Sequence, residues 1–66
     1  MIKGMENFNP EIQEKILEIY EMQMNAFGGK IKGHELKEVF IQDNLPCVRF
    51  ENRDWYHYQL DSKTWF

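Results

Sequence analysis

One stretch of the chain alternates apolar and acidic residues at helical spacing, and this stretch limits the folds open to the chain. At about 100° per residue, the apolar side chains fall on one arc and the glutamates on the opposite arc. Asn9 is a good N-cap, and Pro10 suits the first helical position, where no hydrogen bond needs its missing N–H. Gly28 and Gly29 readily take the left-handed conformation that ends a helix. We therefore predict an amphipathic helix over residues 10–27, preceded by an N-terminal tail over residues 1–8. The apolar arc comprises Ile12, Ile16, Leu17, Ile19, Tyr20, Met24 and Phe27.

The segment after this helix can be interpreted in two ways. Leu36, Val39 and Phe40 follow i, i+3, i+4 spacing, which predicts a short second helix over residues 34–42. The alternative is a strand through Val39-Phe40-Ile41. Periodicity favours the helix.

Residues 46–66 have the composition of a three-stranded antiparallel meander. Two β-prone runs, Cys47–Phe50 and Trp55–Leu60, flank a polar four-residue turn, and a second turn leads into Thr64-Trp65-Phe66. Side chains alternate along a strand, so Trp55, His57 and Gln59 share one face, while Tyr56, Tyr58 and Leu60 share the other. With 66 residues the chain forms one small domain, and its predicted class is α+β.

The net charge lies entirely in the first part of the chain. Residues 1–29 hold two lysines and five glutamates, whereas residues 30–66 are balanced, so the whole net charge of −3 belongs to the helical part. Glutamates one turn apart repel one another and cost helix stability. The predicted acidic contact face for a basic partner comprises Glu11, Glu14, Glu18 and Glu21.

Bulky rings in the meander form the second candidate surface. One helix can cover only one face of a small sheet, so some rings should remain exposed, and exposed aromatic and arginine side chains dominate protein interfaces. Rings of this kind also stack on single-stranded nucleic acid. The predicted aromatic contact face comprises Trp55, His57, Tyr58, Trp65 and Arg53.

Catalytic and metal-binding patterns are weak in this sequence. The stretch from Gly28 to Gly33 lacks the G-K-[ST] ending of a phosphate-binding loop. His34, Cys47 and His57 are isolated, without the paired spacing that arranges a metal site, and a buried small hydrophobe is the usual role of a lone cysteine. We therefore predict no enzyme, metal or cofactor.

Composition also bears on location and assembly. The longest apolar run is the three residues Val39–Ile41, and no cationic start precedes an apolar stretch, so we expect no membrane span and no secretory signal. With a single cysteine, Cys47, no internal disulfide can form, and the cytoplasm is the expected location. Met22, Met24 and the rings offer apolar surface that predicts a homodimer.

Two partial resemblances lie in the second half of the chain. Tyr56-His57-Tyr58 followed by Asp61-Ser62-Lys63-Thr64-Trp65 resembles the second and third strands of a WW module, and Leu45-Pro46 stands where that family has its own Leu-Pro. The chain lacks that family's early tryptophan and its proline after the last tryptophan, and no family is assigned. The predicted order of helix, short helix and hairpin resembles a winged-helix outline.

These features predict a small protein-binding module. It would act as an inhibitor or regulator, of the kind that phages and mobile elements encode, and occlude a basic site on a larger protein with its acidic helix and exposed rings. The alternative is a nucleic-acid-binding module, winged-helix-like or with an aromatic sheet, that uses a basic patch near the hairpin. That patch would comprise Lys30, Lys32, Arg49, Arg53 and Lys63.

Overall fold

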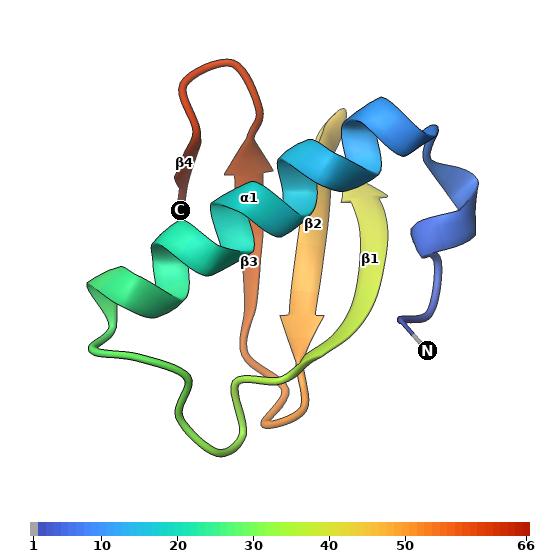
Figure 1. Cartoon of the computed structure of the whole chain (residues 1–66). Coiled ribbons are helices and arrows are strands. Elements are labelled where there is room, and N and C mark those ends of the chain that lie inside the picture. Colours follow the sequence, from blue (N-terminus) through green and yellow to red (C-terminus); the bar gives the residue numbers. More distant parts are fainter. Residues whose placement is uncertain (1) are drawn as a thin grey trace.

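A single long helix lies across one face of a four-stranded antiparallel sheet (Figure 1). The computed structural model describes residues 2–66. The strands stand side by side in chain order, β1-β2-β3-β4. The elements are η1 (Met5–Asn7, a 3₁₀ helix), α1 (Pro10–Ala26), β1 (Leu36–Gln42), β2 (Leu45–Phe50), β3 (Trp55–Gln59) and β4 (Thr64–Trp65).

The helix predicted from the amphipathic pattern is confirmed. The side-chain oxygen of Asn9 accepts a hydrogen bond from the Ile12 N–H at 2.9 Å, and Pro10 opens the helix. At the other end Gly28 and Gly29 both have positive φ, 94° and 117°, which lets the chain leave the helix.

The predicted second helix over residues 34–42 is wrong, because β1 occupies Leu36–Gln42. The register of β1 against β2 slips at its start: Leu36 pairs with Phe50 but Glu38 pairs with Arg49, which leaves Lys37 as an extra, bulged residue. The bulge brings Leu36 and Val39 to the same face of the strand although they are three residues apart. This spacing imitates the period of a helix. With a strand here, the sheet has four strands instead of three, and the winged-helix outline is absent.

The turn between β1 and β2 is a two-residue hairpin. Asp43 and Asn44 both have positive φ, 54° and 62°, the combination of a type I′ turn, whose twist matches that of the flanking strands. Asp and Asn tolerate this conformation better than other non-glycine residues. The hairpin fixes the pairing of Gln42 with Leu45 and thereby the register of the whole strand pair.

The segment predicted as an N-terminal tail is attached to the outer edge of β1. The Lys3 N–H donates to the Lys37 carbonyl at 3.0 Å, and the Val39 N–H donates to the Lys3 carbonyl at 2.8 Å. Gly4 follows with φ 85° and is buried against the strand. Residues 2–4 therefore cover part of an edge that would otherwise be open for pairing.

The core lies between α1 and the sheet. Ile16, Ile19 and Met24 of the helix are buried, and they belong to one apolar cluster with Val39, Val48, Phe50 and Tyr58 of the strands. Gln23 is also buried, and its side-chain carbonyl accepts a 2.6 Å hydrogen bond from the Tyr58 hydroxyl. The cluster occupies a single face of the sheet, so the side chains that point from the strands away from α1 have no covering layer of secondary structure among residues 2–66.

Candidate functional site

The sheet face turned away from α1 carries a mixed aromatic and charged surface, which we call the open face. Strand alternation and register define it: Phe40, Cys47 and His57 are cross-strand neighbours in one row, and the backbone of His57 exchanges two hydrogen bonds with that of Phe66. In the next row Glu38, Arg49 and Trp55 are neighbours. The open face therefore comprises Glu38, Phe40, Cys47, Arg49, Trp55, His57 and Phe66.

Four rings form a continuous row across the open face. Phe40 lies 5.8 Å from Trp55, Trp55 lies 5.0 Å from His57, and His57 stacks on Phe66 at 4.5 Å with the ring planes 2° apart, all measured between centroids. Trp55 keeps 44% of its surface exposed and Phe66 keeps 59%. Trp55 and His57, both on β3, thus connect Phe40 of β1 to Phe66, and Trp55 and Phe66 still present large apolar area to solvent.

Charges of both signs surround these rings. The Arg49 guanidinium donates to the Glu38 carboxylate at 2.7 Å and lies 4.9 Å from the centre of the Phe40 ring. His57 Nε2 lies 3.0 Å from the Asp43 carboxylate, which belongs to the β1–β2 turn. Glu38 thus holds the Arg49 guanidinium over the Phe40 ring. Asp43 in the same way orients the imidazole of His57.

The Cys47 thiol is unsuited to nucleophilic chemistry. Its side chain is fully buried, and burial raises the pKa of the thiol above its usual value of 9.0. The thiol lies near two backbone carbonyls, those of Gln42 and Leu45, and the negative charge of Asp43 also favours its protonated form. Reactive cysteines need the opposite environment, which stabilises a thiolate.

The aromatic residues predicted as one contact face belong to two sides of the sheet. Trp55 and His57 lie on the open face, but Tyr58 is fully buried in the core. Trp65 packs against that core, with its ring edge-on to Phe27 at 6.4 Å. Arg53 is exposed in the β2–β3 turn. Tyr58 and Trp65 thus do not share a surface with Trp55.

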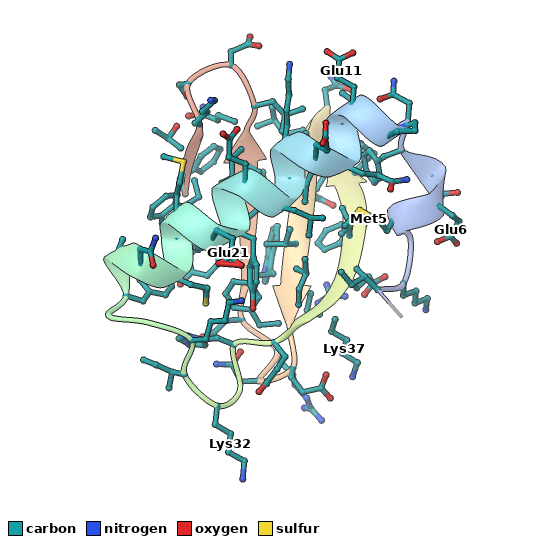
Figure 2. All side chains as sticks on the ribbon, in the orientation of Figure 1. Met5, Glu6, Glu11, Glu21, Lys32 and Lys37 are labelled. Atoms are coloured by element: carbon teal, nitrogen blue, oxygen red, sulfur yellow. The ribbon has the colours of Figure 1, made fainter. Side chains whose placement is uncertain are left out.

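The predicted acidic face lies on α1, on the other side of the sheet from the open face. Figure 2 shows Glu11 near the N-terminal end of the helix and Glu21 farther along it. Three of its four glutamates have lysine partners from the same chain. Glu18 lies 3.2 Å from Lys63, and Glu21 lies 2.9 Å from Lys30, whose pKa is raised by that hydrogen bond. The remaining pair, Glu11 with Lys15, is longer at 3.9 Å, and Glu14 has no ion pair among residues 2–66. Little net negative charge is left for a basic partner.

The basic residues of the alternative prediction are also dispersed. Lys30 and Lys63 reach toward glutamates of α1, while Arg49 lies on the open face with Glu38. Lys32 and Arg53 belong to the end of the molecule where the Asn52 N–H donates to the Gly33 carbonyl at 2.9 Å, and Lys32 points outward there (Figure 2). These five side chains do not form a single patch.

Neither a metal site, nor a membrane-spanning helix, nor a similar protein identifies the function of the described residues. Over residues 2–66 no three or more His, Cys, Asp or Glu side chains gather as metal ligands would, and none of the described helices has the length and hydropathy to span a bilayer. Comparison with protein-family models, curated proteins and solved structures found no match. The candidate site therefore depends on its own geometry.

Five members of the open face are absent from the predicted contact faces: Glu38, Phe40, Cys47, Arg49 and Phe66. The apolar spacing assigns Phe40 to a helix, which hides its place beside Trp55. The signal is present in Asp43-Asn44, two turn-forming residues between β-prone runs. With that hairpin recognised, alternation places Phe40 and Arg49 on the side of Trp55.

Burial of Tyr58 predicts a loss of stability at alkaline pH. Burial raises the pKa of its hydroxyl above the usual value of 10.0, so the folded chain keeps a proton that the unfolded chain releases. The contribution of Tyr58 to the free energy of unfolding is fully present below about pH 9. Above pH 10 we expect it to decline by up to about 1.4 kcal/mol per pH unit. Urea unfolding across this range checks it. Tyr58→Phe should give a shallower decline than wild type, and an equally steep one would assign the effect to Tyr20 and Cys47, whose pKa values burial also raises.

Proposed function

We propose that this chain is a non-enzymatic protein-binding module that contacts its partner with the open face. The observation that carries the proposal is the exposure of Trp55 and Phe66, 44% and 59%, in a row of rings on a sheet face without a covering helix. Aromatic and arginine side chains are enriched at the centres of protein interfaces, where a few of them supply most of the binding energy. Large exposed apolar patches on small proteins commonly mark such surfaces.

In this proposal the acidic face of α1 is not part of the main contact surface, although the sequence predicted that it would be. It lies on the opposite side of the sheet, so one flat contact cannot engage both surfaces. Its glutamates are largely paired with Lys15, Lys30 and Lys63. Exposed pairs of this kind contribute little to stability, but they reduce the field available for steering a basic partner.

Nucleic-acid binding is the second candidate, because a row of exposed rings can stack on unpaired bases. The charge on the open face counts against it. Arg49 is paired with Glu38, and Asp43 adds a further negative charge beside His57, so phosphates would meet no net attraction there.

The test is affinity capture with the full chain as bait, followed by identification of bound proteins. We expect a partner captured by wild type to be lost with Trp55→Ala, with affinity at least about 30-fold lower, equivalent to about 2 kcal/mol. The matched control is Glu14→Lys/Glu18→Lys, which changes α1 and should still capture that partner.

Two outcomes would contradict the proposal. One is a partner that survives Trp55→Ala but is lost with the Glu14/Glu18 variant, which would assign binding to α1. The other is retention of a generic single-stranded oligonucleotide that falls steeply with added salt and depends on Trp55, which would favour nucleic acid. Circular dichroism of each variant excludes unfolding as the cause.

A further inference from the structure

The open face is a continuous layer of side chains over the sheet. Cys47 lies at its centre, between Phe40 and His57 in the register, and yet the Cys47 side chain is 0% exposed. Neighbouring side chains therefore close over the thiol. Such a closed layer suits contact with another broad surface. A small molecule or an inserted peptide would need a concave site instead.

The open face carries charges of both signs, which two identical faces can pair with one another. Glu38 and Asp43 supply the acids beside the rings, and Arg49 supplies the base. A second copy related by a two-fold axis presents both signs in return, so its acids can approach bases across the contact. A strongly charged partner of either sign finds no comparable match.

The arrangement of helix and sheet also favours a second copy of the chain as the partner. Among residues 2–66 the sheet has α1 on one face only, and a second layer over the other face would remove the exposed rings of Trp55 and Phe66 from water. A second sheet packs at about 10 Å, face to face, and an identical one matches it in size. The molecule measures 28 × 24 × 21 Å, so one of its faces is smaller than the roughly 800 Å² per partner of a standard interface.

We infer that two copies of this chain associate open face to open face, with Trp55 and Phe66 of each copy buried in the contact. The inference rests on the proposed function, because it names the partner of that surface. The interface is small, so the dimer forms in a concentration-dependent manner.

Sedimentation equilibrium tests the inference with the full chain, between about 1 μM and about 1 mM, where a small interface dissociates. Wild type should change from the 8.1 kDa chain mass to about twice that value as concentration rises. Trp55→Glu should remain at the monomer mass throughout. Leu17→Glu is the matched control, since Leu17 is 42% exposed but lies on α1, and it should associate as wild type does.

Each other result overturns the inference. A wild-type mass that stays at 8.1 kDa excludes self-association, as does doubling that survives Trp55→Glu or disappears with Leu17→Glu. If wild type stays monomeric but captures a protein that Trp55→Ala does not capture, the proposed function is supported. Only the second copy is then excluded as the partner. Urea unfolding of both glutamate variants shows that they remain folded.

Discussion

Phe50→Ala is expected to destabilise the chain by about 3–5 kcal/mol, a large part of its total stability. Phe50 is fully buried, and its ring lies 6.0 Å from Tyr20, 5.5 Å from His34 and 5.7 Å from Tyr56, between centroids. Truncation of a buried phenylalanine costs about 3–5 kcal/mol. A domain of 66 residues has a total stability of roughly 3–10 kcal/mol, so this loss removes much or all of it. Urea unfolding followed by circular dichroism measures the change.

Phe66→Ala is the matched control for this experiment. Both changes remove the same ring, but Phe66 is 59% exposed and lies on the open face, stacked on His57. We expect its loss to cost less than about 1 kcal/mol in the monomer, as for most substitutions at exposed positions. Equal destabilisation by the two changes would contradict the assignment of the core to the α1 side of the sheet.

Gly4→Ala is expected to release the N-terminal segment from β1 and to destabilise the chain by about 2 kcal/mol or more. A Cβ at this position would lie 2.1 Å from the Val39 carbonyl oxygen, and Gly4 has φ 85°, a conformation that costs an L-residue roughly 1–2 kcal/mol. The clashing atom, the Val39 carbonyl oxygen, belongs to the backbone and cannot move away by rotating as the end of a side chain can. The alanine therefore breaks the hydrogen bonds between Lys3 and β1.

Amide hydrogen exchange measures this release directly. The Val39 N–H donates to the Lys3 carbonyl at 2.8 Å, and it should exchange much faster in Gly4→Ala. Gly28→Ala serves as the control, because Gly28 also has positive φ, 94°, but a Cβ added there would meet nothing within 4 Å. That variant should lose some stability and keep Val39 protected. Unchanged protection in Gly4→Ala would show that the segment is not held as described.

The parts of the fold that depend on local chemistry can be predicted from the sequence. The α+β class, the bounds of the long helix and the alternation of Trp55 and Tyr58 all follow from short-range periodicity and capping. β1 escapes this reasoning because the bulge at Lys37 gives an irregular strand the spacing of a helix turn. Bulges depend on pairing with a distant strand, and spacing within one segment does not record that pairing.

The candidate site can be predicted only in part, for a related reason. Alternation places Trp55 and His57 correctly on one face, but the choice of which face the helix covers depends on tertiary packing. Gln23 illustrates this dependence. Its amide lies within the apolar arc and is fully buried, and its side-chain carbonyl accepts a hydrogen bond from the Tyr58 hydroxyl. The lysine partners of the glutamates, Lys30 and Lys63, also come from segments whose positions only the fold determines.

The order of the strands has a consequence for how the chain acquires its structure. Each strand pairs with the one that follows it, so every strand pairing closes a short segment of chain, the tightest being the two residues of the first hairpin. Closing short segments costs little conformational entropy. The kinetic barrier is therefore expected to lie in docking the helix onto a preformed meander, since that step joins the residues most distant along the polypeptide.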